Sequence, residues 1–321
     1  MKNLNTFLVF CLLVFACLSM GAQDKSIKGY RMEGDEVVFT FDVRDYKIVT
    51  DERSQQRMDF EDFDIENVVV SGAFNFWSRD AWKMKKVSDS VYELRKKLSD
   101  FQDNFEWEFK FVINHKYWAE PTEDIRNIAP AIEGGKYLNT YNLKFFNAYI
   151  SEEGNTSFFL DGFQDAETVI LAGSFNKWDE ELFPMKPSEF GWKLTLQLPP
   201  DVYEYKFIVD GEWIEDPANP NKKKNEFDGY NSVLVVTTEV NFTLHGFEEA
   251  TKVILAGDFN NWSESDYEMK KSDTGWTYTI SLTGGKYHYK YIVDGIWMVD
   301  PYNKVREFDG HGNINSVKMV R

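Results

Sequence analysis

The chain has 321 residues, of which 43% are hydrophobic and 17% aromatic, and its formal net charge is −17. This length suffices for two or three domains with packed cores, and the hydrophobic content excludes a largely disordered chain. The acidic charge, with no basic run beyond Lys222–Lys224, excludes nucleic acid and anionic membrane surfaces as binding partners.

Residues 1–22 are predicted to be a signal peptide. Lys2 precedes a short apolar stretch at 7–18, and the segment ends in small residues. We therefore expect a bacterial protein exported to the periplasm, the cell surface or the medium. Both cysteines, Cys11 and Cys17, lie in this segment, so the rest of the chain has no thiol and no disulfide. The alternative is lipid attachment at Cys17, the one case in which we expect membrane association.

The first part of the exported chain is predicted to be a β-domain with two additions. Residues 36–43 alternate apolar and polar side chains, as a strand does. An acidic stretch at 44–64, which we expect to be a mobile loop, separates this strand from the next at 68–71. A second addition at 120–140 precedes the closing strand at 141–145.

The rest of the chain repeats the pattern of the first part. VILAGSFNKW at 169–178 recurs 84 residues later as VILAGDFNNW at 253–262, and a looser copy, VVVSGAFNFW, stands at 68–77. Recurrence at this spacing indicates tandem domains. The predicted domains span 23–150, 151–236 and 237–321. No linker rich in glycine, serine or proline separates the last two, so we expect them to abut.

A hairpin is predicted in the second repeat, where residues 203–216 read YEYKFIVDGEWIED. Its Asp-Gly pair at 210–211 favours a two-residue turn, because both positions must tolerate positive φ. With that turn, Ile208 faces Trp213 across the hairpin. Alternation then places Lys206 and Trp213 on the same face.

The other two repeats carry the same hairpin. YHYKYIVDGIWMVD at 287–300 places Lys290 beside Trp297, with the same turn. In the first repeat the turn is one residue longer, yet this register still leaves Lys110 and Trp118 on a common face.

Strands with one buried and one wet face are predicted elsewhere in the repeats. GWKLTLQL at 191–198 alternates strictly, and residues 275–282 do the same, which assigns Trp192 and Trp276 to the core. Turn signals separate these short segments, and none has a convincing helical period. The pattern is typical of an antiparallel β-sandwich.

Taken together, the motifs resemble a known family. Gly-x-Phe-Asn-x-Trp, then Tyr-x-Tyr-Lys-aromatic-Ile-Val-Asp-Gly-x-Trp, then Asp-Pro and Asn-Ser-Val are similar to the glycogen-binding module of the AMP-activated protein kinase β subunit, one of the family 48 carbohydrate-binding modules. The resemblance is close in repeats two and three and partial in repeat one. It implies an all-β protein of three tandem immunoglobulin-like, early-set β-sandwiches.

The resemblance also implies the binding residues. In that family two tryptophans and a lysine grip an α-1,4-glucan, an asparagine adds a hydrogen bond, and an apolar residue precedes that asparagine by four positions. Carried over, these are Trp178, Lys206, Trp213, Phe227 and Asn231 in repeat two, Trp262, Lys290, Trp297 and Asn315 in repeat three, and Trp77, Lys110 and Trp118 in repeat one. By the similarity of EFDG at 226–229 and 307–310, Phe308 would match Phe227, with a three-residue shift from the repeat period. Asn142, which follows the long addition, would match Asn231.

Aromatic residues of this kind suit a sugar ligand. The axial C–H groups of glucose form an apolar face, and an indole that covers it gains about 1 kcal/mol. Lysine and asparagine then donate hydrogen bonds to hydroxyl groups. Two tryptophans on different loops form a curved surface, and α-1,4-glucans curve. The alternative is that Trp178 and Trp213 pack inside their own domain.

Nothing in the sequence indicates catalysis. The acids of the Asp-Gly and Asp-Pro pairs are predicted to form turns; they are Asp210, Asp294, Asp216 and Asp300. Glycoside hydrolysis needs two acids across a deep cleft, for which a small sandwich has no room. The histidines have no metal-ligand spacing; they are His115, His245, His288 and His311. We predict no enzyme activity, no cofactor and no metal.

The sequence therefore predicts an exported, non-catalytic protein that binds glycogen, starch or a maltooligosaccharide. One alternative is a structural or protein-interaction scaffold of the cell envelope. Another is an accessory subunit that delivers α-glucan to a separate glycoside hydrolase. Kinase regulation does not carry over, because an exported chain would not meet the kinase.

Overall fold

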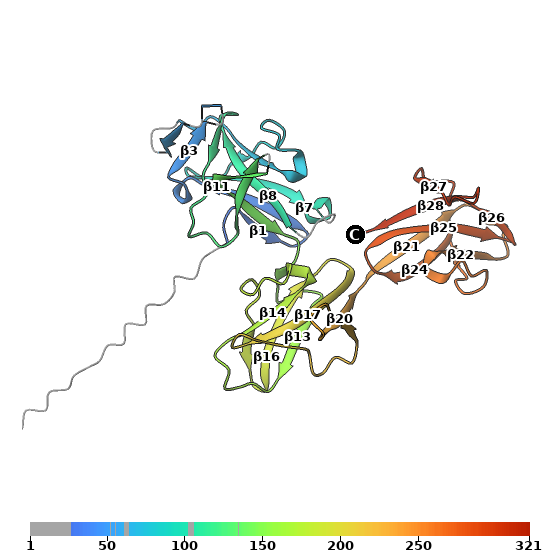
Figure 1. Cartoon of the computed structure of the whole chain (residues 1–321). Helices are drawn as coiled ribbons and strands as arrows, with labels where there is room; N and C mark the ends of the chain where they lie inside the picture. Colours follow the sequence, from blue (N-terminus) through green and yellow to red (C-terminus); the bar gives the residue numbers. More distant parts are fainter. Residues whose placement is uncertain (1–26, 52, 55, 61–63, 102–105, 134) are drawn as a thin grey trace, which may run out of the picture.

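The structure is a computed structural model in which the described residues form β-sheets (Figure 1). The described residues are 27–51, 53–54, 56–60, 64–101, 106–133 and 135–321. The expected signal peptide lies outside them. Within them, the only helical segments are 3-10 turns of three or four residues, as expected of an all-β chain. They are η1 (Val43–Asp45), η3 (Ala73–Asn75), η4 (Leu98–Phe101), η5 (Ser174–Asn176) and η6 (Asp258–Asn260).

Module 1, residues 27–148, consists of two antiparallel sheets that enclose one core. The first has the order β1 (Tyr30–Glu33), β2 (Glu36–Asp42), β7 (Val91–Lys97), β6 (Lys85–Lys86). The second has the order β10 (Ile128–Glu133), β11 (Lys136–Phe146), β8 (Glu106–Ile113), β9 (Tyr117–Ala119), β3 (Ile48–Asp51), β4 (Arg57–Asp59), and β5 (Val68–Gly72) also pairs with β8.

Module 2, residues 149–236, repeats this plan without the additions. One sheet has the order β12 (Tyr149–Ile150), β16 (Gly191–Gln197), β13 (Thr156–Asp161), and β15 (Lys186–Ser188) also pairs with β16. The other has the order β14 (Val169–Gly173), β17 (Asp201–Val209), β20 (Tyr230–Val236), β19 (Lys222–Lys224), and β18 (Glu212–Ile214) also pairs with β17. Because Tyr149 and Ile150 pair with β16, this module begins two residues before the expected boundary at 151.

Module 3, residues 237–321, matches module 2 strand for strand except for β12. One sheet has the order β21 (Thr238–His245), β24 (Gly275–Leu282), β23 (Lys270–Ser272). The other has the order β22 (Val253–Gly257), β25 (Gly285–Val293), β28 (Ile314–Val320), β27 (Arg306–Phe308), and β26 (Ile296–Met298) also pairs with β25. The three modules are immunoglobulin-like antiparallel sandwiches, as the motifs implied.

The two additions to module 1 are largely built into its second sheet. The stretch at 44–64 was expected to be a mobile loop, but its described residues include the paired strands β3 and β4. Strand β3 also pairs with β9, which places Thr50 opposite Trp118. The addition at 120–140 contributes β10 and the start of β11. The loop prediction was wrong because the polar composition of this stretch hid two short strands.

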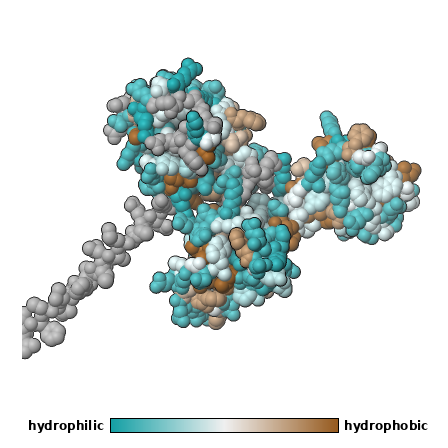
Figure 2. Space-filling view, viewed as in Figure 1, coloured by the Kyte–Doolittle hydropathy of each residue, from teal (hydrophilic) through white to brown (hydrophobic). Residues whose placement is uncertain are grey.

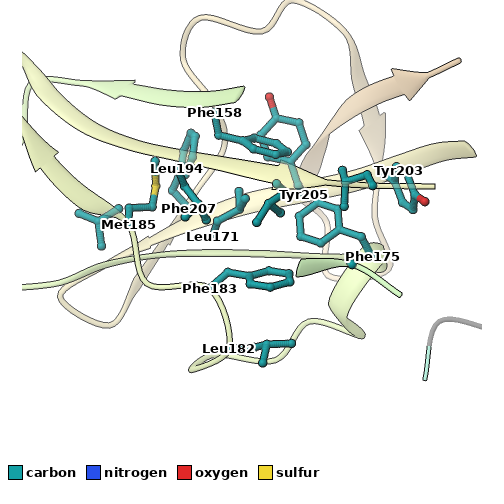
Figure 3. Packing of buried hydrophobic residues seen from close by; sticks show 14 of the residues in the cluster. Phe158, Leu171, Phe175, Leu182, Phe183, Met185, Leu194, Tyr203, Tyr205 and Phe207 are labelled. Atoms are coloured by element: carbon teal, nitrogen blue, oxygen red, sulfur yellow. The ribbon is translucent and has the colours of Figure 1, made fainter. Parts of the chain in front are cut away.

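The core of module 2 lies between its sheets and is strongly aromatic (Figure 3). Phe158, Tyr205 and Phe207 pack edge to face, with centroids 5.2 Å apart for the first pair and 5.9 Å for the second. Leu171 and Leu194 reach the same core from the two facing sheets. On β16, Trp192 and the leucines that alternate with polar residues are all buried, which confirms the predicted face.

The modules abut, as predicted from the absence of a linker. Strand β20 ends at Val236 and β21 begins at Thr238, so one residue joins modules 2 and 3. The Gly284 amide of module 3 also donates to the Pro200 carbonyl of module 2 over 2.8 Å. Elsewhere hydrophilic residues cover most of the visible surface of all three modules (Figure 2).

Replacing Phe207 by alanine should destabilise module 2 by about 3–5 kcal/mol, because its ring is fully buried and its removal leaves a cavity. The measurement is urea unfolding of the full chain, followed by amide hydrogen exchange in β14 and β17. Phe159→Ala is the matched control, since that ring is 46% exposed on the outer face of β13. Equal losses in the two variants would contradict this core assignment.

Candidate functional site

The Gly-x-Phe-Asn-x-Trp motif folds into a locked loop that presents its tryptophan. In module 2, Phe175 is buried in the core, and the Asn176 side-chain oxygen accepts the Gly173 N–H over 2.9 Å. Lys177 and Trp178 then adopt left-handed backbone conformations, with φ of 53° and 61°. The Trp178 N–H donates to the Gly173 carbonyl over 2.9 Å, which fixes the backbone position from which the indole extends.

Gly173 is required at the start of this loop by a close backbone approach. A Cβ at this position would lie 2.5 Å from the Glu204 carbonyl oxygen on β17. The same approach occurs at Gly72 and Gly257, and all three modules make the same hydrogen bonds between the glycine, the asparagine and the tryptophan. The equivalent residues are Gly72, Asn75 and Trp77 in module 1 and Gly257, Asn260 and Trp262 in module 3.

The second tryptophan of module 2 comes from the hairpin β17–β18. Its register is as predicted: Ile208 pairs with Trp213, and Val209 pairs with Glu212. The Asp210 side chain accepts the Thr168 N–H over 2.7 Å, so this acid holds the turn, as predicted. Asp294 makes the equivalent bonds in module 3.

The Asp-Pro and Asn-Ser-Val motifs are explained by a buried cluster behind the site. The Tyr205 hydroxyl donates to Asp216 over 2.6 Å, and the Asp216 N–H donates to the Ser232 hydroxyl over 2.9 Å. Burial raises the pKa of Tyr205. Tyr289, Asp300 and Ser316 repeat the cluster in module 3. Asp216 and Asp300 therefore have a structural role, since each links a buried tyrosine to a serine. Asn231 directly precedes the serine of the module 2 cluster.

In module 2 the five predicted residues line one groove of about 820 Å³. The Trp178 and Trp213 ring centroids lie 6.1 Å apart, and the rings are inclined by 53°. Trp178 is half-buried and Trp213 is 37% exposed, so neither ring is sealed in the core. The groove residues are Ser174, Trp178, Glu180, Glu204, Lys206, Trp213, Lys223, Lys224, Asn225, Glu226, Phe227, Gly229 and Asn231. We call the two tryptophans and the lysine of each module its platform.

The lysine of this platform is available to a ligand. Within the described part of the chain, Lys206 makes no hydrogen bond and no ion pair. Asn231, in contrast, is already engaged: its amide donates to Glu204 over 2.8 Å and accepts from Asn225 over 2.9 Å. One N–H of Asn231 is left for a ligand, so its expected contribution is smaller than that of Lys206.

Module 3 presents an equivalent platform. The Trp262 and Trp297 centroids lie 6.3 Å apart with an inclination of 40°, and Trp297 is 38% exposed. Lys290, like Lys206, makes no hydrogen bond or ion pair to the described residues. Asn315 is only 4% exposed and, among those same residues, its side chain has no partner.

The expected equivalence of Phe308 and Phe227 is wrong. Strand pairing sets Lys224 opposite Tyr230 in module 2 and Phe308 opposite Ile314 in module 3, so Phe308 occupies the position of Lys224. The strict 84-residue period therefore holds through this loop, and His311 stands where Phe227 stands. Both phenylalanines are exposed. The local similarity of the EFDG segments misled the alignment.

Module 1 departs most from the predicted site. Trp77 and Trp118 do meet, with centroids 6.2 Å apart and rings at 74°. Lys110, however, is 6% exposed and is bound to the Glu120 carboxylate over 2.9 Å, so it is not available to a ligand. Burial lowers the pKa of Lys110, and Glu120 opposes that shift. The Arg79 guanidinium lies 5.2 Å from the Trp118 ring centre.

Asn142 is placed where the motif implied. Its amide donates to Glu108 over 2.7 Å, as Asn231 donates to Glu204. The long addition before Asn142 therefore does not disturb the position of this residue on β11.

The sequence reasoning missed the charged residues that line the groove of module 2. The lysines at 222–224 form the edge strand β19, from which Lys223 and Lys224 line the groove. Lys223 binds Glu204 over 2.6 Å, which lowers the pKa of that carboxyl. The signal that could have located them is their spacing from Asn231, because Lys223 is its cross-strand partner.

In module 3, His288 occupies the position of Glu204 and is partly buried. Its Nδ1 lies 2.9 Å from Asp258, and its Nε2 lies 3.0 Å from Glu307. A neutral imidazole has a single N–H, so only the protonated ring donates to both carboxylates. The Glu307 hydrogen bond is the main cause that raises the pKa of His288 above its ordinary 6.5; Asp258 adds to it and burial opposes it.

Within the described residues, no three or more histidine, cysteine, aspartate or glutamate side chains are grouped to hold a metal ion. The same residues contain no helix that is long and apolar enough to span a membrane.

Two stretches of the chain match one family model, described as the glycogen recognition site of AMP-activated protein kinase. The matched residues are 162–243, which cover most of module 2 and the start of module 3, and 238–321, which cover module 3. Two copies are thus found where the motifs implied three. Module 1 shares the loop and the hairpin but lies outside the matched residues.

Curated relatives align over one module-sized segment. The 5'-AMP-activated protein kinase subunit beta-1 of Rattus norvegicus is 32% identical over 80 residues, which covers 21% of this chain and 29% of the relative. Subunit beta-2 of Homo sapiens is 37% identical over 57 residues, covering 18% and 21%. Protein PTST homolog 2, chloroplastic, of Arabidopsis thaliana is 40% identical over 73 residues, covering 22% and 13%. The chain thus spans less than a third of each of these relatives.

Solved structures give low overall similarity. The maltogenic amylase from S. marinus has a TM-score of 0.24 and 17% identity, covering 46% of this chain and 27% of that one. The pullulanase from Bacillus acidopullulyticus has a TM-score of 0.21 and 14% identity, covering 92% and 37%. The fold assignment rests on the strand pairing described above.

The contacts of His288 predict a pH-dependent contribution to the stability of module 3. Because the folded pKa is raised, this contribution is complete below the ordinary pKa of about 6.5 and is lost as the pH rises through the folded value. NMR titration should place the pKa of His288 above 6.5, and Glu307→Gln should lower it. A value at or below 6.5 in the unmodified chain would contradict the assignment.

Replacing Glu120 by alanine should destabilise module 1 by about 3–5 kcal/mol, because the buried Lys110 ammonium loses its partner. Glu215→Ala is the control and should cost less than about 1 kcal/mol, since that carboxylate is partly exposed. Chemical unfolding measures both losses, read by hydrogen exchange in β8 for Glu120→Ala and in β17 for Glu215→Ala. Adding Lys110→Met to Glu120→Ala should recover most of the loss; a small loss in the single variant would disprove the buried pair.

Proposed function

The chain belongs, through modules 2 and 3, to the family of the glycogen recognition site of AMP-activated protein kinase, and on that premise we propose that it is an exported, non-catalytic α-glucan-binding protein. The ligands we propose are glycogen, starch and maltooligosaccharides. The observation that carries the proposal is the pairing, in both modules, of two accessible tryptophan rings with a lysine that has no hydrogen-bond or ion-pair partner among the described residues.

The shape of the two platforms suits a curved glucan. Rings inclined by 53° and 40° cannot lie on one flat ribbon of sugars, but they can each cover the apolar face of a different glucose in a turning chain. The Lys206 and Lys290 ammonium groups then donate to hydroxyls, which a neutral sugar supplies in abundance. Both platforms present partly exposed rings at the surface, so each alone binds weakly, on the order of micromolar to millimolar.

Two platforms on one chain strengthen binding to a polymer. Once one platform holds a glycogen or starch particle, the second meets other chain ends at a high effective concentration. Polymeric glucan is therefore the ligand that this arrangement favours over a short oligosaccharide.

Module 1 is proposed to contribute structure more than sugar binding. Its lysine is committed to Glu120, and Arg79 lies over one of its tryptophans. Its Glu106 binds Lys177 of module 2 over 2.7 Å, next to Trp178. These contacts support a role in fixing the neighbouring platform.

A lack of catalysis is part of the proposal and is supported by the roles of the acids. Asp210 and Asp294 hold turns, and Asp216 and Asp300 hold buried tyrosines, so none of the four is a free acid or base in a cleft. Export is supported by the composition of residues 1–22.

Replacing Trp213 and Trp297 together by alanine should abolish retention on a glycogen affinity gel. Either change alone should weaken maltoheptaose binding at its own platform by at least about tenfold, measured by isothermal titration. Trp77→Ala with Trp118→Ala is the matched control and should leave glucan affinity within about twofold. Retention of the Trp213 and Trp297 double variant at the level of the parent would overturn the proposed function.

A further inference from the structure

The three modules differ at the position directly across the hairpin from the platform lysine. In module 1, β8 and β9 pair Val112 with Trp118, and continuing this register sets Glu120 opposite Lys110. Residues that face each other in this way have Cβ atoms about 4.5–5.5 Å apart, which is within reach of an ion pair. The 2.9 Å contact between Lys110 and Glu120 is that pair.

Module 2 has the same carboxylate at the same position but not the same pair. Its hairpin pairs Ile208 with Trp213, so continuing the register sets Glu215 opposite Lys206. The Glu215 carboxylate is instead bound to Lys222 over 2.6 Å. The Lys222 hydrogen bond is the main cause of the lowered pKa of Glu215, and the charge of Lys206 adds to it, yet Lys206 makes no ion pair with any described residue.

The competing cation comes from the neighbouring edge strand. In module 2, Lys222 of β19 pairs with Ser232. In module 1 the corresponding pair is Ile128 with Leu143, so an apolar residue stands where Lys222 stands. Glu120 therefore has no cation at that position to draw it away from Lys110.

Module 3 has no carboxylate opposite its platform lysine. Its hairpin pairs Ile292 with Trp297, so Val299 lies opposite Lys290. Arg306, in the position of Lys222, donates to backbone carbonyls. Lys290 is left without a carboxylate across the hairpin.

We propose that Lys222 is a positioning residue of the module 2 platform: it holds Glu215 away from Lys206 and so keeps the Lys206 ammonium available to a glucose hydroxyl. The proposal rests on the proposed function, because it explains which platforms can bind. A carboxylate across from the lysine closes a platform when its neighbour on the edge strand is apolar, as in module 1. It leaves the platform open when that neighbour is a lysine.

The physical reason is competition for one ammonium group. A bond between lysine and a carboxylate is charge-assisted and stronger than a bond to a neutral hydroxyl. A sugar hydroxyl could bind the lysine only after the bond between lysine and carboxylate had been broken. Diverting Glu215 removes that cost before the ligand arrives.

Lys222→Met tests the proposal in a full chain that also carries Trp262→Ala and Trp297→Ala, so that module 2 alone reports binding. Isothermal titration with maltoheptaose should show about fivefold or greater weakening, in line with the loss of one hydrogen bond to a charged donor. Adding Glu215→Gln should restore the affinity to within about twofold. Unchanged affinity in Lys222→Met, or a loss that Glu215→Gln does not rescue, would overturn the proposal.

The reciprocal change should block the Lys290 ammonium of module 3 and weaken glucan binding there. In a chain with Trp178→Ala and Trp213→Ala, the pair Val299→Glu and Arg306→Ile recreates the arrangement of module 1 and should weaken maltoheptaose binding by a similar factor. Val299→Gln with Arg306→Ile is the neutral control and should weaken it less than twofold. Equal losses in the two variants would count against the proposal.

A measurement without sugar separates this proposal from the proposed function. In Lys222→Met, carbon-detected NMR should show that the pKa of the Glu215 carboxyl remains below its ordinary value, because Lys206 has taken the place of Lys222. Adding Lys206→Met should return the pKa to that ordinary value. If the pKa is already ordinary in Lys222→Met, then Lys206 does not capture Glu215 and the proposal is wrong, whether or not any glucan binds.

Discussion

The two-residue turn at 210–211 fixes which side chains share a face of the β17–β18 hairpin. Positive φ at Asp210 and Gly211 sets the register. That register places Trp213 on the face of Lys206 and sets Glu215 across from the lysine. A shift of one residue would turn the indole to the opposite face. The longer turn of module 1 keeps the same relation between lysine, tryptophan and glutamate. The hairpin of module 3 keeps the relation between lysine and tryptophan, with Val299 in place of the glutamate.

The shared scaffold allows different electrostatic outcomes in each module. The loop that presents the first tryptophan has the same hydrogen bonds throughout, and the ring pairs differ little in separation. What differs is the partner of the lysine: a buried carboxylate in module 1, and none among the described residues in modules 2 and 3. Under the proposed function, access to the lysine therefore matters as much as the aromatic rings, because a carboxylate that binds the lysine keeps it from the ligand.

The sequence predicts those features that depend on local geometry, and fails where a distant segment intervenes. The hairpin register and the buried face of β16 follow from turn chemistry and alternation, so both were predicted correctly. The ion pair between Lys110 and Glu120 was not predicted, because a motif match shows neither the burial of a lysine nor its partner on the adjacent strand. Phe308 was misplaced because a four-letter similarity outweighed the repeat period, whereas pairing of β27 with β28 decides the position. The strands at 48–51 and 57–59 were hidden by polar composition.

The most direct test of the account is an NMR titration of the full chain with maltoheptaose that follows the indole N–H signals. The account predicts that the signals of Trp178, Trp213, Trp262 and Trp297 shift and saturate, while those of Trp77 and Trp118 stay in place. Unmoved signals in modules 2 and 3, or equal shifts in module 1, would contradict it.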